Sequence, residues 1–144
     1  MINLDTVGRL NERKITVFGT GSATEWIHIV MGIGFTTGIE AKSVAQDLGG
    51  SDQKSFTDAG VPAVQIFTGA HEDYHRPSDL PGAIDTTGMV KVATFVREAL
   101  VYLAEREQPM TSTLGAGEDK PSTPSPAPSG RRVSLGTLPE FSFP

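Results

Sequence analysis

Apolar positions along the first 106 residues follow two different spacings. Short runs rich in β-branched residues are typical of strands. We place such strands at residues 2–4, 14–18, 36–41 and 61–67. Helical patterns lie between them, at residues 23–33 and 51–59. We expect Ser22 to cap the first helix, with Glu25 completing a capping box, and Ser51 to cap the second.

The longest helical pattern spans residues 87–107. Its apolar residues recur at three- and four-residue steps and form one stripe, which predicts a helix packed on a core. The stripe consists of Met89, Val92, Val96, Leu100 and Leu103. Because strands and helices alternate along the chain, the pattern indicates an α/β layered fold.

Composition divides the chain into three parts. Residues 1–108 carry all of these elements and predict one modest domain. Residues 109–130 are rich in Pro, Ser, Thr and Gly, which predicts a disordered, partly extended linker. Residues 131–144 resume an alternating strand pattern from Val133 to Leu138. This stretch is too short to fold alone, so we interpret it as the first strand of a further domain.

Charge and composition exclude several classes of protein. Of the 144 residues, 38% are hydrophobic and 20% are charged, with a net charge of −5, which is typical of a mildly acidic globular protein. Without a basic stripe, no nucleic-acid partner is expected. No apolar run approaches the roughly 20 residues that span a bilayer, and the amino terminus lacks a signal-peptide pattern. Because cysteine is absent, a transition-metal site must use imidazole and carboxylate ligands, which favours zinc.

Residues 67–79 hold the densest chemistry: two of the three histidines, three acids, a tyrosine and an arginine. His75 is either a metal ligand, oriented by Asp79 or Asp73 through its second ring nitrogen, or a loop histidine bonded to the backbone. Tyr74 either directs its hydroxyl at a developing oxyanion or packs its ring over the loop. The cluster predicts a metal-dependent hydrolytic site.

Two other side chains of this loop are given supporting roles. We expect His71 to line the cleft or hold the turn rather than to bind a metal. We expect Arg76 either to form a local ion pair with Asp73 or Asp79 or to anchor a substrate carboxylate.

Further candidates precede this loop. Asp5 ends a buried strand, and acids at the carboxyl ends of strands in α/β sheets lie where ligands bind; the alternative is an acid that starts a turn. Asp52 either hydrogen-bonds into the cleft or favours a helix start through the dipole. Phe56 forms either an apolar wall of the cleft or part of the core.

Three segments, in this order, resemble the M28 family of zinc-dependent exopeptidases. They are Ile2-Asn3-Leu4-Asp5-Thr6-Val7-Gly8-Arg9, the stretch from Gly50-Ser51-Asp52 through Ser55-Phe56 to Gly60-Val61-Pro62-Ala63, and Phe67-Thr68-Gly69 through Tyr74-His75-Arg76-Pro77-Ser78-Asp79. The resemblance covers roughly residues 1–106. It implies a three-layer α/β/α sandwich around a mixed sheet.

The resemblance also implies an activity, the removal of N-terminal amino acids from peptides by water activated at two zinc ions. Asp5 would be a carboxylate ligand to one zinc and His75 the imidazole ligand to the other. Tyr74 would stabilise the tetrahedral intermediate. The residues that would support the metals or face the substrate are Asp52, Phe56, His71 and Asp79.

The chain departs from the family pattern at two points. In the family, a histidine, a bridging aspartate and two consecutive glutamates, one of them the catalytic base, precede the strand that here ends at Asp5. None has a counterpart in this chain. We therefore expect Met1 to be an internal residue of a longer protein, apolar sheet edges and faces to be uncovered, and the chain to be inactive alone. At the second point, Gln53 stands where family members commonly have histidine.

Residues 131–139 resemble the opening of a PDZ domain as found after some M28 peptidase domains. Two classes of function are then expected, a zinc aminopeptidase present as a fragment or a non-catalytic peptidase-like module that binds peptides or acts as a scaffold. A third reading, a single structural zinc held by His71, His75 and Asp79, is geometrically cramped.

Overall fold

The computed structural model describes residues 1–115. Its strands are β1 (Ile2–Leu4), β2 (Ile15–Phe18), β3 (Ala41–Val44) and β4 (Val64–Phe67). Its helices are α1 (Trp26–Thr37), α2 (Gln53–Asp58) and α3 (Thr86–Glu105), with 3₁₀ turns η1 (Thr20–Ser22) and η2 (Pro81–Ala83). In this part of the chain no helix is both long enough and apolar enough to span a membrane. The predicted PDZ-like strand and residues 116–130 of the predicted linker lie outside the described residues.

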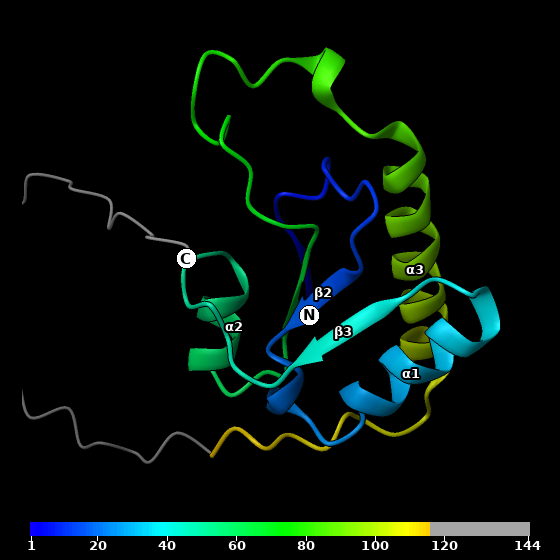
Figure 1. Cartoon of the computed structure of the whole chain (residues 1–144). Helices are drawn as coiled ribbons and strands as arrows, with labels where there is room; N and C mark the ends of the chain where they lie inside the picture. Colours follow the sequence, from blue (N-terminus) through cyan, green and yellow to red (C-terminus); the bar gives the residue numbers. More distant parts are fainter. Residues whose placement is uncertain (116–144) are drawn as a thin grey trace, which may run out of the picture.

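The four strands form one mixed sheet in the order β1-β4-β2-β3. β1 pairs with β4 and β2 with β3 in parallel, whereas β2 and β4 are antiparallel. Helices α1 and α3 cover one face of the sheet and α2 lies against the other (Figure 1). The expected α/β layered fold with a mixed sheet is confirmed.

The hydrophobic core lies between the sheet and the pair α1 and α3. Alternate residues of the central strands point into it, as the pleat of a strand requires. The strand residues in the core are Ile15, Val17, Val64 and Ile66. The opposite face of β4 carries Gln65 instead, and this side chain is also buried. The two faces of the sheet therefore differ, one apolar and one polar under α2.

The predicted start of the first helix is wrong, because its residues have other partners. Ser22 ends the η1 turn, and its buried hydroxyl accepts from Trp26 Nε1 at 3.1 Å and from the Ala63 backbone N–H at 3.1 Å. Glu25 holds the N-cap position of α1 without a side-chain cap hydrogen bond. Its carboxylate instead accepts from the backbone N–H of Thr111, which holds the pKa of Glu25 below its ordinary value. A tertiary contact thus replaces the expected capping box.

The second helix and one strand also differ from their predicted form. α2 begins at Gln53, and Ser51 does not cap it, because the Ser51 hydroxyl accepts from Asn3 Nδ2 at 2.8 Å. The strand expected at residues 36–41 forms at Ala41–Val44, since α1 continues to Thr37 and ends at Gly38 in the left-handed conformation. Boundaries were less predictable than the elements themselves.

The long helix forms within two residues of its predicted bounds. Val92 and Val96 are buried as expected, but Met89 and Leu100 are 40% and 52% exposed. The buried stripe is completed by Gly88, Phe95 and Ala99. Because successive residues turn by 100°, Met89 and Leu100 fall at the margin of the face that meets the sheet.

The segment after α3 turns back along the domain. The backbone of residues 111–113 hydrogen-bonds to residues 22–24, and Ala23 and Ser112 form an isolated antiparallel bridge. Met110 packs against the core, and Arg106 pairs with Glu25 at 3.2 Å. Residues 109–115, placed in the linker by composition, therefore contact the domain.

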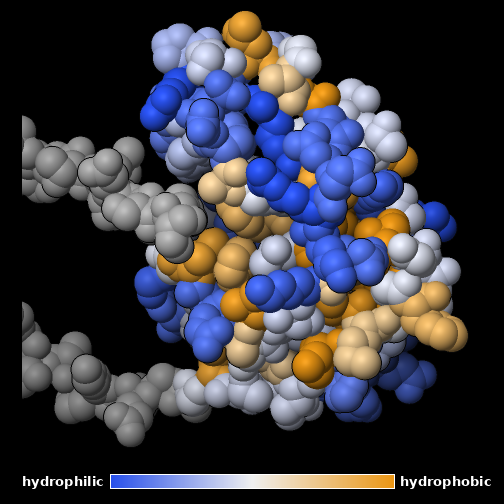
Figure 2. All heavy atoms as spheres, in the orientation of Figure 1, coloured by the Kyte–Doolittle hydropathy of each residue, from blue (hydrophilic) through white to orange (hydrophobic). Residues whose placement is uncertain are grey.

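Several large apolar side chains of the described residues are exposed, and those named here lie on helices α1 and α3 rather than on the sheet. On α1 they follow a four-residue step through Ile27, Met31 and Phe35, and Phe35 is 92% exposed. On α3 they include Val90 and Leu100. Figure 2 shows apolar side chains at the surface among polar ones.

We predict that Ser22→Ala destabilises the fold. The substitution leaves the buried N–H groups of Trp26 and Ala63 without an acceptor, and each unsatisfied buried group costs about 1–3 kcal/mol. The free energy of unfolding, measured with urea, should fall by about 2–4 kcal/mol. Ser55→Ala, at an exposed position of α2, is the matched control and should change it by less than about 0.5 kcal/mol. Equal losses in the two variants would contradict the prediction.

Candidate functional site

The carboxyl ends of β1 and β4 lie side by side, because the two strands run parallel with Leu4 opposite Ile66. The pairing continues past the strands. The Asp5 N–H donates to the Ile66 carbonyl at 3.2 Å, and Thr68 donates to the Thr6 carbonyl from its backbone N–H at 3.2 Å and from its hydroxyl at 2.7 Å. Asp5 and the start of the loop at residues 68–80 thus share one edge of the sheet, where ligands of α/β proteins bind.

Asp5 is partly buried and its two carboxylate oxygens have different partners. Oδ1 accepts from the Thr6 hydroxyl at 3.1 Å, and Oδ2 accepts from Gln65 Nε2 at 3.5 Å. Thr6 has a positive φ of 53°, which is unusual for a β-branched residue. The turn that follows Asp5 is therefore held by hydrogen bonds in a conformation that the sequence does not favour.

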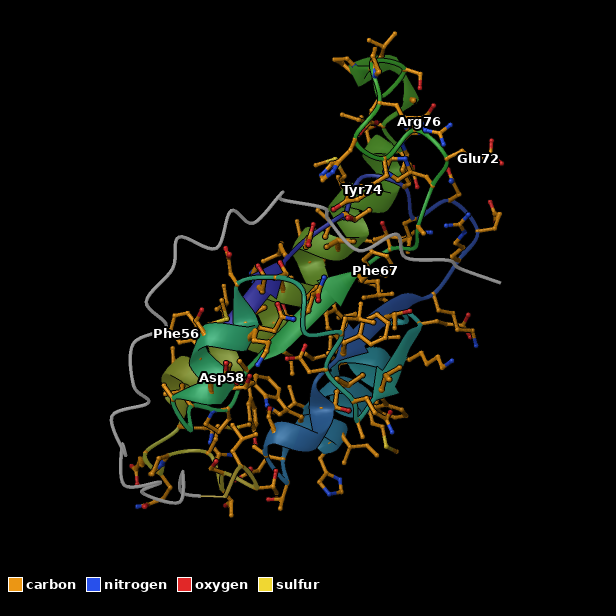
Figure 3. The ribbon with its side chains drawn as sticks, turned by 90° about the vertical axis from the view of Figure 1, so that its left-hand side faces the viewer. Phe56, Asp58, Phe67, Glu72, Tyr74 and Arg76 are labelled. Carbon is orange, nitrogen blue, oxygen red and sulfur yellow. The ribbon has the colours of Figure 1, made fainter. Side chains whose placement is uncertain are left out.

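Arg9 fastens the loop to this edge. Its side chain is 15% exposed, and its guanidinium lies 2.7 Å from Asp79 and 3.3 Å from Asp73. The pKa of Asp73 is lowered, first by the Ser78 side-chain hydrogen bond and then by the charge of Arg9. The local ion pair expected for Arg76 is wrong: within residues 1–115 Arg76 forms none, and its side chain is exposed in Figure 3. Arg9 follows the end of β1 in the sequence. Its side chain is more buried than that of Arg76 and contacts both acids.

The loop carries Tyr74, predicted to stabilise the transition state, next to His75, predicted as a metal ligand. The rings of Tyr74 and His75 stack at 3.9 Å between centroids with 18° between their planes. His75 has φ of 57°, a strained backbone state of the kind found at functional sites. Tyr74 is 49% exposed and projects from the loop in Figure 3. The Tyr74 ring therefore stacks on the His75 ring and still remains about half exposed to solvent.

A pocket of about 290 Å³ lies beneath this loop. Its wall is formed by residues of the β1 turn, the loop and η2: Thr6, Gly8, Arg9, His71, Asp79, Leu80, Pro81 and Ile84. His71 also meets the Tyr74 ring edge-on at 6.2 Å, and its Nδ1 is buried without a hydrogen-bond partner among the described residues. His71 and Asp79 therefore both line this cavity, and His71 contacts Tyr74.

The two candidates on α2 lie apart from this loop. Asp52 is exposed at the N-cap position, and within residues 1–115 its side chain makes no hydrogen bond. Phe56 is 42% exposed, so the structure does not place it in the core. Figure 3 shows Phe56 separated from Tyr74 by the length of the sheet edge. The structure does not bring these two residues to the tyrosine-histidine pair.

A buried chain of amides was not anticipated from the sequence. Asn3, Gln53 and Gln65 are 8%, 0% and 3% exposed, and they hydrogen-bond to one another beneath α2. The signal that could have revealed them is a polar residue inside an apolar strand, as in Ile2-Asn3-Leu4 and Val64-Gln65-Ile66. Gln53 keeps a polar role although it replaces the histidine expected from the family resemblance.

Comparison with known proteins identifies the family. The model for peptidase family M28 matches residues 1–100 of the 144. The chain belongs to peptidase family M28. Neither the curated proteins nor the solved structures yielded a match.

Membership in M28 makes the chain a metallopeptidase-type hydrolase related to enzymes that act on peptides, and the family is generally zinc-dependent. Within residues 1–115, however, no three His, Asp or Glu side chains are grouped so that they hold a metal ion. A catalytic zinc takes about three protein ligands. The described residues of this M28 chain therefore do not fit a zinc centre by themselves, and the cramped site of His71, His75 and Asp79 is excluded.

We predict that Arg9→Met loosens the loop of this M28 chain. The variant keeps an apolar stem and removes the charge that contacts Asp73 and Asp79. Amide exchange at residues 74–79 should accelerate by about fivefold, the scale expected for a partly exposed ion-pair network. Arg76→Met, in the same loop, is the matched control and should leave exchange unchanged. An equal response of the two variants would rule out a fastening role for Arg9.

We also predict a loss of loop order in acid. Because the pKa of Asp73 is lowered in the folded state from its ordinary 3.8, its stabilising contribution is complete above that value and disappears as the pH falls through the lowered one. The amide of Arg76, which donates to the Asp73 carbonyl, should lose exchange protection in that range. Asp73→Asn should abolish this pH dependence, whereas Glu72→Gln, at an exposed neighbour, should retain it.

Proposed function

We propose that this chain forms one wall of a zinc aminopeptidase site, with peptides as substrates. Asp5 and His75 are the zinc donors that it supplies. The observation that carries the proposal is the parallel pairing of β1 with β4 inside the family match, since it brings Asp5 and the loop bearing His75 to the same edge of the sheet. Each donor is held by a neighbour, Asp5 by Thr6 and His75 by the Tyr74 ring.

We propose Tyr74 as a hydrogen-bond donor to the substrate. Its side chain is 49% exposed, so a peptide can reach its hydroxyl without displacing the core. In the proposed function this hydroxyl donates to the carbonyl oxygen of the scissile bond as negative charge develops there. The adjacent pocket, lined by His71 and Asp79, would accept part of the same substrate.

The two donors are too few for the two zinc ions that the aminopeptidase reaction is proposed to use. Each catalytic zinc takes about three protein ligands, and no third donor joins Asp5 or His75 within residues 1–115. The general base is likewise not assigned to any described residue. We therefore infer that the 144-residue chain, purified alone, has little or no peptidase activity and binds zinc weakly.

The test measures zinc binding by calorimetry and hydrolysis of an amino-acid anilide by the same preparation. We expect weak zinc binding that drops at least tenfold in Asp5→Asn and His75→Ala, together with no measurable turnover. His28→Ala, at an exposed position of α1, is the matched control and should bind zinc like the parent.

Two results would contradict this proposal. Turnover that is robust and abolished by His75→Ala would show that the chain is a complete enzyme. Zinc binding that depends on His28 as much as on His75 would refute the assignment of donors.

A non-catalytic peptide-binding module is the second candidate, because the described residues lack a grouped metal site while the pocket beneath the loop is open. Peptide binding that persists in the presence of a chelator would favour this module over the peptidase.

A further inference from the structure

The buried amides beneath α2 form a continuous hydrogen-bonded chain that ends at Asp5. Asn3 Nδ2 donates to Ser51 Oγ at 2.8 Å and to Gln53 Oε1 at 3.0 Å. Gln53 Nε2 then donates to Gln65 Oε1 at 3.1 Å, and Gln65 Nε2 donates to Asp5 Oδ2 at 3.5 Å. The chain crosses from the first turn of α2, over β4, to the cleft edge of the sheet.

Gln53 is the centre of this amide network, and each of its polar groups has a partner. Besides Gln65, its Nε2 donates to Asp47 Oδ1 at 2.6 Å, so both N–H groups and the carbonyl have partners. The side chain is completely buried. A buried amide with every group paired has one orientation, because any rotation leaves a polar group without a partner.

The orientation of each amide in this hydrogen-bonded network is set by two carboxylates at its ends, those of Asp47 and Asp5. An ionised carboxylate only accepts hydrogen bonds, so Asp47 requires the Nε2 side of Gln53. Gln53 then presents its second N–H to Gln65, which must receive it with Oε1 and turn its own Nε2 toward Asp5. Reversing one amide would set two donors or two acceptors against each other.

We propose that Gln53, acting through Gln65, is a positioning residue for the carboxylate of Asp5. The two contacts of that carboxylate come from opposite sides, Gln65 on Oδ2 and Thr6 on Oδ1. The backbone at Asp5 is already tied to Ile66, so the side-chain contacts decide how the carboxylate faces the cleft. The role of this orientation in zinc binding rests on the proposed function. The coupling of Gln53 to Asp5 is independent of that function.

The test uses the full 144-residue chain with ¹³C and ¹⁵N labels. The readout is the carboxyl carbon resonance of Asp5 and the side-chain amide resonances of Gln65. Gln53→Glu keeps the shape but removes both donors, and Gln53→Met removes all hydrogen bonding at similar volume. Gln46→Glu makes the same chemical change at an exposed position of the preceding loop, outside the hydrogen-bonded amide network. It is the matched control.

We expect the Asp5 carboxyl resonance to shift in both Gln53 variants, although residue 53 does not touch Asp5, and to stay in place in Gln46→Glu. Exchange of the Gln65 side-chain amide protons should accelerate about tenfold, as for loss of one hydrogen bond. An unmoved Asp5 resonance in a folded Gln53 variant would overturn the proposal.

If both Gln53 variants fail to fold, the reciprocal measurement decides. Asp5→Asn, at a partly exposed position, should then shift the side-chain amide resonances of Gln53, and an absence of any shift overturns the proposal. A zinc titration of the same samples separates the two proposals. A parent chain that binds no zinc refutes the proposed function while the resonances still report on the coupling. Weaker zinc binding in Gln53→Met than in Gln46→Glu supports both.

Discussion

The parallel pairing of β1 with β4 is the contact on which the rest of the site depends. β1 has three residues and one partner in the described sheet, yet it brings Asp5, Thr6 and Arg9 to the start of the loop at residues 68–80. The Thr6–Thr68 hydrogen bonds and the Arg9 ion pairs of that loop both depend on this pairing. Because side chains of a strand alternate between faces, a shift of one residue in register would exchange Asn3 for a neighbour and break the amide chain beneath α2. The apolar core under α1 and α3 fixes that register from the other face, through Val64 and Ile66.

The sequence was sufficient for the elements that are governed by short-range periodicity. The helix at residues 86–105 has a long apolar repeat and an aspartate, Asp85, that caps it by accepting from the Gly88 N–H. Element ends were less predictable, because residues that cap helices by preference can bond elsewhere. Ser22 and Ser51 both accept hydrogen bonds from segments far away in the chain, namely from Ala63 and from Asn3. No local pattern contains those partners.

The candidate site shows the same division between local and distant information. The loop bearing Tyr74 and His75 was identifiable from its density of ionisable and aromatic side chains, and the pairing of strands could be expected to bring Asp5 near it. The residue that fastens the loop was assigned wrongly, since Arg76 is adjacent in sequence while Arg9 is adjacent in space. The role of Gln53 was missed for a related reason. An isolated glutamine carries no pattern, and its importance arises from three partners contributed by β1, β4 and the loop before α2.

The return of residues 110–114 along η1 and the start of α1 bears on how this protein can be handled. β2 runs antiparallel to β4, so the η1 turn lies at the opposite end of the sheet from the loop that carries His75. In Figure 1 the chain accordingly leaves the described region on the side away from that loop. A fluorophore or surface anchor placed at residue 115 would be attached at this remote end. A force applied there would act on the contacts of residues 110–114 before it acts on α3. Immobilisation through this point would attach the described domain at the end opposite the loop that carries His75, which suits it to surface-based measurements of peptide and metal binding.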